Sequence, residues 1–302
     1  MKLAALVIFA ATPALAGPMT TATCQDVWTL VETAIGRPVQ AGAPSLTGTG
    51  CVVRDIEVPS AGDFGVAVKI RSARFSGDGL IPSGDWLALT SLGVSIDDLR
   101  LSPQTPDPSL SWLLDQQAER GGIRVELDAA AVEGGWDVKS LHGDFPGDNE
   151  LDVSLAASGL DLSSRAQAMA SIGTARLNAL DLSLTMDGFF ETYLLMPLGY
   201  ALLIGAPNPE QRVNELKAEA SAFVDVLPTA SVDQGSKTAL KDLISDLPHP
   251  KGKLTVKLDS NTGLGAPNLM PLVLSGLGDD PAKALATILN GVAIDVTWTR
   301  AP

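Results

Sequence analysis

The chain has few of the residues on which most catalytic sites depend. Its 302 residues include only two histidines and two cysteines, and 5% of them are aromatic. It contains no G-x-S-x-G elbow, no H-E-x-x-H helix, no Walker loop and no Cys–His cluster, so the corresponding hydrolases, metalloproteases, nucleotide-binding proteins and zinc sites have no support. No catalytic residue, cofactor or metal site is therefore predicted, and whether the protein is an enzyme stays open.

Positive charge is also scarce. The chain has 21 lysines and arginines against 35 aspartates and glutamates, which gives a formal net charge of −14. Such a chain is repelled by nucleic acid and by anionic lipid surfaces, so neither is expected as a partner. The excess of acid is typical of a protein kept in solution by its charge.

No apolar run is long enough to cross a bilayer, so no integral membrane segment is expected in the mature chain. The first residues have another pattern: Met1-Lys2, an apolar run over residues 3–11, and Ala14-Leu15-Ala16 before Gly17. This pattern predicts a signal peptide over residues 1–16 and an exported mature chain, periplasmic or secreted. Gly17 takes the place of a lipid-bearing cysteine, so a lipoprotein is not expected.

The two cysteines, Cys24 and Cys51, are predicted to form a disulfide, because an exported chain with one pair has one intramolecular connectivity. On the chain-entropy model, the closed loop is worth about 3–4 kcal/mol. The long spacing differs from the C-x-x-C pattern of redox-active pairs.

Strict alternation of apolar and polar residues is the most regular pattern in the chain. It predicts strands with one dry and one wet face. The segments that show it are 66–70, 123–128, 151–155, 180–186, 253–259 and 294–298. One-sided strands favour an antiparallel sheet. The apolar parity changes at Asp97-Asp98 and between Ile70 and Ala73, which predicts β-bulges and a curved sheet.

Helices are predicted between these strands from caps and stop signals. They span residues 25–35, 109–120, 163–172, 209–226 and 237–247, with a last helix from Asp280-Pro281 to near Gly291. The predicted fold is α+β, a curved, largely antiparallel sheet with several helices on its apolar face. Residues 17–302 form a single exported domain, with 17–160 and 161–302 as an alternative two-part organisation.

The most apolar stretch of the mature chain spans residues 189–204 and is interrupted by Pro197 and Gly199. A helix that is apolar on nearly every side needs dry surroundings. Two interpretations stay open: burial under the sheet, or a surface for lipid or another apolar small molecule. In the second case the contacting residues would be Leu194, Leu195, Leu198, Leu202 and Leu203.

The remaining polar candidates have ordinary explanations. His142 is expected in a turn and His249 in a rigid Pro-His-Pro connection. Residues 143–152 offer oxygen ligands of the kind calcium takes, but their spacing does not match an EF-hand, so a solvated acidic turn is the default. Neighbouring residues of a strand point to opposite faces, so the carboxylates of Asp97 and Asp98 can form one site only if a bulge reorients one of them. The pair Asp279-Asp280 before Pro281 is typical of a helix N-cap.

The segment 247–258, LPHPKGKLTVKL, followed by a Gly/Leu-rich stretch to residue 277, resembles a pattern in bacterial envelope proteins. These include uncharacterised periplasmic β-rich proteins and, more distantly, the AsmA group. The resemblance covers about thirty residues. It implies a β-rich envelope protein that handles apolar molecules, and it assigns no functional residue.

The expected function is therefore that of a non-enzymatic cell-envelope protein that binds or scaffolds, with a lipid or another apolar molecule as the expected ligand. Its protein partner is unknown. The alternatives are a hydrolase whose site is not visible as a motif, and a structural partner of an outer-membrane assembly. A binder predicts an apolar cavity, an enzyme a polar cleft, and an assembly partner an exposed strand edge or apolar patch.

Overall fold

A computed structural model describes residues 19–48, 50–60, 65–80, 82–83, 86–119, 121–268, 270 and 280–301. The predicted signal peptide lies outside these residues, as do Asp279 and residues 269 and 271–277 of the Gly/Leu-rich stretch. Among the residues described, no helix is both long enough and apolar enough to cross a membrane.

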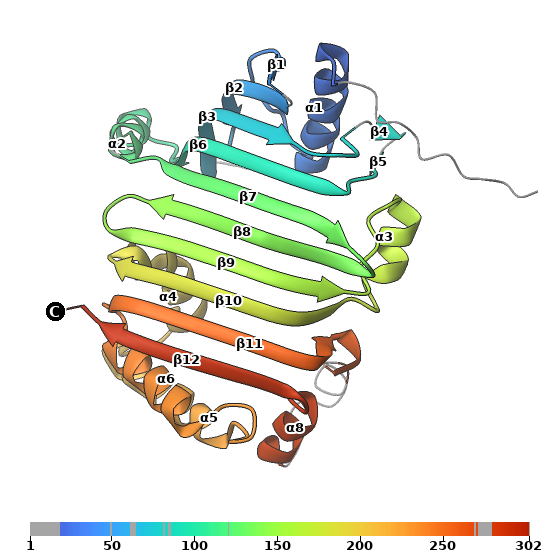
Figure 1. Cartoon of the computed structure of the whole chain (residues 1–302). Helices are drawn as coiled ribbons and strands as arrows, with labels where there is room; N and C mark the ends of the chain where they lie inside the picture. The colour runs from blue at the N-terminus through green and yellow to red at the C-terminus, as the bar shows by residue number, and fades with distance from the viewer. Residues whose placement is uncertain are drawn as a thin grey trace, which may run out of the picture.

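One open, curved sheet of ten antiparallel strands organises the molecule (Figure 1). The strands in spatial order are β1 (Ser45–Thr47), β2 (Gly50–Val58), β3 (Val66–Ser76), β6 (Ser91–Pro103), β7 (Ile123–Val132), β8 (Gly135–Phe145), β9 (Asn149–Ser158), β10 (Arg176–Asp187), β11 (Lys251–Gly265) and β12 (Val292–Arg300). A separate small hairpin consists of β4 (Pro82–Ser83) and β5 (Trp86–Leu87). The predicted α+β class with a curved antiparallel sheet is confirmed.

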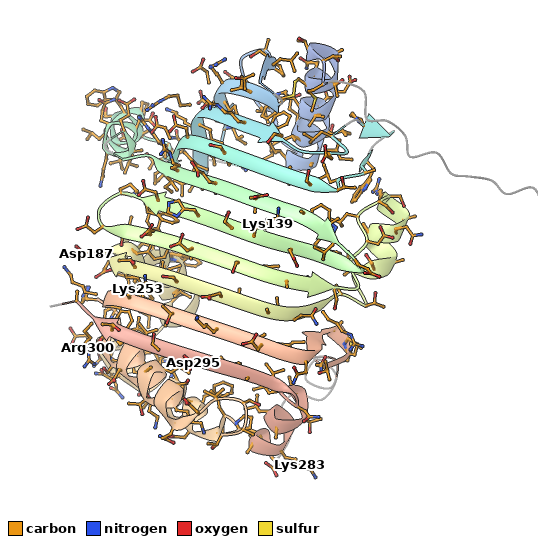
Figure 2. All side chains as sticks on the ribbon, in the orientation of Figure 1. Lys139, Asp187, Lys253, Lys283, Asp295 and Arg300 are labelled. Atoms are coloured by element: carbon orange, nitrogen blue, oxygen red, sulfur yellow. A yellow bond between two sulfur atoms is a disulfide. The ribbon has the colours of Figure 1, made fainter. Side chains whose placement is uncertain are left out.

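The register places apolar side chains of all ten strands on one face of the sheet. One row across the strands shows the pattern, because directly paired residues point to the same side. This row runs through Phe75, Val94, Leu127, Leu141, Val153, Leu182, Val256 and Val296. The opposite face is polar, and Lys139, Lys253 and Asp295 lie along it in Figure 2. The alternation in the sequence therefore predicts the two faces correctly.

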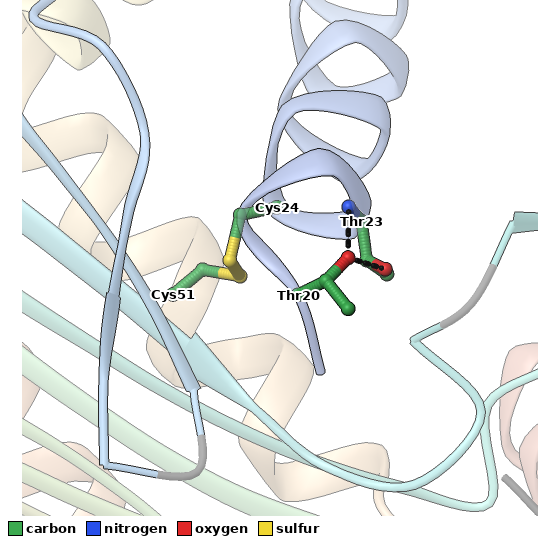
Figure 3. Close-up of a disulfide and its surroundings, with 4 residues drawn as sticks. All are labelled: Thr20, Thr23, Cys24 and Cys51. Atoms are coloured by element: carbon green, nitrogen blue, oxygen red, sulfur yellow. Dashed lines mark hydrogen bonds between the residues drawn. A yellow bond between two sulfur atoms is a disulfide. The ribbon is translucent and has the colours of Figure 1, made fainter. Parts of the chain in front are cut away.

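Helix α1 (Thr21–Ile35) covers the apolar face at the N-terminal end of the sheet. Thr20 caps the helix by accepting a hydrogen bond from the amide of Thr23, and Gly36 ends it in the left-handed conformation. The predicted disulfide joins Cys24 of this helix to Cys51 of β2, and both cysteines are fully buried (Figure 3).

The long connection between β10 and β11 forms a group of helices at the other end of the sheet. It contains η1 (Phe190–Leu194), α4 (Leu195–Leu203), α5 (Pro209–Val226) and α6 (Gln234–Asp246). Helix α6 packs on β12, α5 packs on α6, and α4 contacts α5. The short π-helix η1 and helix α4 together replace the single apolar helix that the sequence indicated.

Three further helices lie at the ends of the strands: α2 (Pro108–Ala118), α3 (Arg165–Ser171) and α8 (Pro281–Ile288). Asp107 and Asp280 cap α2 and α8, each with proline as the first helical residue, as the sequence predicted. Ile288 of α8 and the adjoining Leu289 pack with Leu258 of β11 in a hydrophobic cluster at this end of the sheet.

One of the two predicted bulges is present. The register of β6 on β7 shifts between Ile96 and Leu99, where Asp98 has a φ of 58°. Left-handed backbone at a non-glycine residue is uncommon, and here it marks the bulge. The bulge predicted between Ile70 and Ala73 is wrong, because β3 keeps a constant register with both β2 and β6 across these residues.

Candidate functional site

The central part of the apolar face lacks the helical cover that its two ends have. Helix α1 packs at β1 and β2, and helix α6 packs at β12. Among the described helices, none lies along β7, β8 or β9, and η1 contacts β8 through Phe145 at the end of that strand. We call the apolar side chains of β7–β10 in this region the central apolar face. Its members are Val125, Leu127, Val138, Leu141, Leu151, Val153, Leu155, Leu180, Leu182 and Leu184.

Burial differs sharply between the covered and uncovered parts of this face. Val53 under α1 is completely buried, and Val296 beside α6 is almost so. All ten residues of the central apolar face are half-buried instead, although they have the same aliphatic character and the same orientation. The sheet therefore continues a core-like surface across about four strands, roughly 15–20 Å at the usual strand spacing, without a matching layer among the described residues.

A second apolar feature lies within the helical group. A cavity of about 300 Å³ is lined by Phe190, Leu195, Leu198, Gly199, Leu202, Leu203, Val213, Leu216, Lys217, Ala220, Ile244, Leu247 and Pro248. Four of the five leucines predicted to contact an apolar ligand, Leu195, Leu198, Leu202 and Leu203, line this cavity together. Leu194 does not. The volume is at the lower end of the range for small-molecule pockets.

Lys217 contributes its aliphatic stem rather than its charge to the cavity wall. Its Nζ donates hydrogen bonds to the carbonyl oxygens of Ser245 and Leu247, at 2.7 and 2.8 Å. These carbonyls belong to the C-terminal end of α6, where a cation is favourable. Lys217 is the single charged residue of the lining, and its amine is bound to carbonyl oxygens. The surface that lines the cavity is therefore apolar.

The outer side of α4 exposes large apolar side chains to solvent. Met196, Tyr200 and Ile204, at the end of the helix, are 78%, 74% and 66% exposed. Their spacing of four residues puts them on one side of the helix, away from the side that lines the cavity with Leu195 and Leu203. The interpretation of residues 189–204 as a segment buried under the sheet is therefore wrong for this side of α4.

Aromatic side chains anchor η1 to the sheet. The ring of Phe145 at the end of β8 lies 5.0 Å from that of Phe189 and 5.4 Å from that of Tyr193. Edge-to-face contacts of this kind stabilise beyond the area they bury. Burial also raises the pKa of the Tyr193 hydroxyl. The beginning of the helical group is thus fixed at one end of the central apolar face.

The polar face of the sheet has two grooves, which are the features to compare with the polar cleft that the enzyme alternative predicts. One, of about 460 Å³, includes Glu126 and Asp128, and the other, of about 420 Å³, includes Asp137 and Asp181. Neither contains a histidine or a cysteine with a free thiol. Their linings are mainly the outward side chains of sheet strands, which gives no paired acid and base in a dry environment.

The edge strand β12 is partly closed to strand addition. The amide of Ile294 donates to the carbonyl of Ser231 at 2.7 Å, and the amide of Val296 donates to Oγ of Ser236 at 2.9 Å. These are the outward amides that an added strand would need. The β12 edge of the sheet therefore offers the assembly-partner alternative little room for an added strand.

The guanidinium group of Arg71 bridges the carboxylates of Asp97 and Asp98. Arg71 forms ion pairs with both, and Arg100 binds both oxygens of Asp98. Hydrogen bonds from Arg100, and then from Arg71, hold the pKa of Asp98 below its ordinary value. The bulge does bring the two acids together, and the result is an ion-pair network that holds the bulge.

Two expectations about the acidic segment need correction. His142 lies in strand β8, because the bulge between Val138 and Leu141 lets the strand continue to Phe145. The turn is confined to residues 146–148. The side-chain amide of Asn149 is engaged by the backbone of Pro146 and Asp187, so it is not a free oxygen ligand.

The other histidine, His249, is exposed as expected but has a partner. Its Nδ1 lies 2.9 Å from Oε1 of Glu191 in η1. The pair links the entry of β11 to the start of the helical group.

No protein-family model matches this chain, and a search of curated proteins finds no match. The resemblance of the 247–277 segment to envelope proteins therefore stays a prediction, and the site rests on the geometry alone.

Sequence patterns identified the leucines of the cavity but missed the central apolar face. The apolar residues of its strands were assigned to a closed core, because alternation shows which side chains share a face and not whether a helix covers them. Strand β8 was missed altogether. Its bulge separates Val138 from Leu141 by three residues and breaks the period of two.

Proposed function

We propose that this chain is an exported, non-enzymatic protein of the cell envelope that binds lipid-like molecules through their acyl chains. The observation that carries the proposal is the central apolar face, a band of partly exposed aliphatic side chains across β7–β10. Soluble monomers rarely leave a contiguous apolar surface of this kind without a ligand or partner. An acyl chain lying on it gains about 0.8 kcal/mol for each buried methylene.

The apolar cavity and α4 support the same ligand class. Leu198 and Leu202 line the cavity and are also substantially exposed, so the cavity is open on the side of these residues. Neither apolar feature offers a charged group that would require a charged ligand, because the amine of Lys217 is bound to carbonyls. Export is supported by the buried disulfide, which forms in oxidising compartments.

Titration with a fluorescent fatty acid tests the proposal. The native protein should bind the probe saturably, and Val153→Asp should weaken binding at least tenfold, because the new carboxylate lies in the middle of the central apolar face. Ser154→Asp is the matched control: it is the next residue of the same strand, on the polar face, and its binding should match the native protein.

The outcomes separate clearly. Lack of saturable binding by the native protein would reject the proposal. Equal weakening by both substitutions would assign the effect to charge or folding rather than to this face. A Leu198→Trp variant locates the ligand further, since its fluorescence should respond to a bound acyl chain only if the ligand also reaches the cavity.

A further inference from the structure

The polar face of the sheet brings together three metal-ligating groups that are separate in the sequence. His142 of β8 lies directly opposite Asp152 of β9, and Glu150 lies two residues before Asp152, on the same face. Among the described residues, these three form the one His–carboxylate cluster of this size. The cluster lies on the face opposite the central apolar face.

The distances within the cluster lie near those of a coordination sphere. Nδ1 of His142 is 2.8 Å from Oδ1 of Asp152 and 3.8 Å from Oε1 of Glu150, and one ligand atom from each residue lies within 4.8 Å of the others. In a tetrahedral zinc site with bonds of about 2.0–2.2 Å, ligand atoms are about 3.3–3.6 Å apart. The two histidine distances lie on either side of this value, so small side-chain rotations would suffice.

The surrounding charges favour a cation at this point. Glu126 of β7 lies opposite His142, and Asp144 of β8 lies opposite Glu150. The nearest cation in the register, Arg124, is paired with Asp97 at 3.8 Å.

We propose that His142, Glu150 and Asp152 bind a divalent transition-metal ion, with zinc as the preferred ion. Nδ1 of His142 and one carboxylate oxygen from each acid would supply three ligands, and water would complete the sphere. An imidazole nitrogen with two carboxylates suits zinc or manganese, whereas calcium takes six to eight oxygen ligands. The two strands are hydrogen-bonded within the sheet, so the ligands are held on a rigid frame.

The competing explanation is a plain ion pair between a protonated His142 and Asp152. The chain contains a matched example of such a pair, His249 with Glu191 at 2.9 Å, which lacks the third ligand that the His142 cluster has. His249 is therefore the internal control for nonspecific binding of metal to an exposed histidine.

Isothermal titration calorimetry decides between these explanations. Tag-free protein with its disulfide intact is treated with EDTA, dialysed, and titrated with zinc chloride at pH 7.5. We expect one equivalent of zinc to bind, His142→Ala and Asp152→Asn each to weaken binding at least tenfold, and His249→Ala to leave it unchanged. Circular dichroism of each variant establishes that it is folded.

A second readout keeps the test independent of stability. Cobalt, substituted for zinc, should give visible d–d absorption bands in the native protein and in His249→Ala but not in His142→Ala. No saturable zinc binding by the native protein would overturn the proposal. So would binding that survives His142→Ala, or that is lost in His249→Ala. None of these outcomes bears on the fatty-acid titration, which probes the opposite face.

Discussion

Arg100 holds both carboxylate oxygens of Asp98: its Nε lies 2.8 Å from Oδ1, and its NH2 group lies 2.9 Å from Oδ2. Asp98 is the left-handed residue of the β6 bulge, and its side chain is only 12% exposed. The bidentate pair thus fixes an uncommon backbone conformation at the point where β6 bends. Gly122 must lack a side chain here, because a Cβ would overlap the carboxylate of Asp98.

Replacing this carboxylate should destabilise the protein in a pH-dependent way. Asp98→Asn should lower the free energy of unfolding by about 2 kcal/mol at neutral pH, since it leaves Arg100 and Arg71 without their charged partner. The folded pKa of Asp98 lies below its ordinary value of 3.8. The stabilisation is therefore fully present above the ordinary pKa and is lost as the pH falls through the lowered folded pKa.

Urea unfolding of native protein and Asp98→Asn at several pH values measures this difference. The gap between the two proteins should stay constant from neutral pH to about pH 5 and shrink below pH 4. Asp97→Asn is the control: Asp97 is more exposed and makes longer contacts, so its loss should cost less than about 1 kcal/mol. If the stability difference between native protein and Asp98→Asn grew on acidification, the stabilisation could not be assigned to the ionised carboxylate of Asp98.

The disulfide should be complete in protein isolated from its native compartment. Mass spectrometry after alkylation without reduction should show neither Cys24 nor Cys51 modified. The double variant Cys24→Ser/Cys51→Ser should lose about 3–4 kcal/mol of stability on the chain-entropy model. Two freely alkylated thiols in freshly isolated protein would refute the prediction, whatever the stability of the variant.

Charged substitutions should separate the covered from the uncovered part of the apolar face. Val53→Asp buries an unpaired carboxylate under α1 and should cost at least about 4 kcal/mol. Val153→Asp puts the same group on the half-exposed central apolar face, where water reaches it, so the cost should be about half as large or less. Chemical denaturation of both variants checks the ranking, and equal costs would mean that the central face is closed in solution.

Gly252 tests the close approach of β11 and β12. Its φ is 148°, and a Cβ at this position would overlap the carbonyl of Thr299, so Gly252→Ala should cost about 2–4 kcal/mol. Gly205 also has a positive φ, 82°, but a Cβ there meets nothing within 4 Å. Gly205→Ala should therefore cost only the conformational strain, about 1–2 kcal/mol. Thermal unfolding of the pair gives the comparison, and similar losses would contradict the close approach.

Much of the sheet could be predicted because its register obeys a local rule. Leu180 and Leu258, or Ile123 and Leu99, share a face through simple alternation and pairing, and the parity change at Asp97-Asp98 marks a real bulge. Capping residues such as Asp107 likewise fix helix starts from nearest neighbours. These are short-range constraints, which a sequence shows directly.

The sites could not be predicted to the same degree because they depend on distant segments. Leu198 and Ile244 line one cavity only because α4 and α6 meet through α5. His142 and Asp152 are each visible as candidates in the sequence, but their contact arises from the β8–β9 register, which a bulge shifts. Nothing in the local pattern indicates that α1 and α6 leave the strands between them uncovered.

The order of strands in the large sheet follows the order of the chain, so each strand lies beside the strands that come before and after it in that sheet. A hairpin inserted at a loop would therefore add two strands without rethreading any other part of the chain. At about 4.8 Å per strand, each insertion would lengthen the apolar face by roughly 10 Å. The architecture can thus grow or shrink in steps of one hairpin, and the length of the apolar face becomes a quantity set by duplication and deletion.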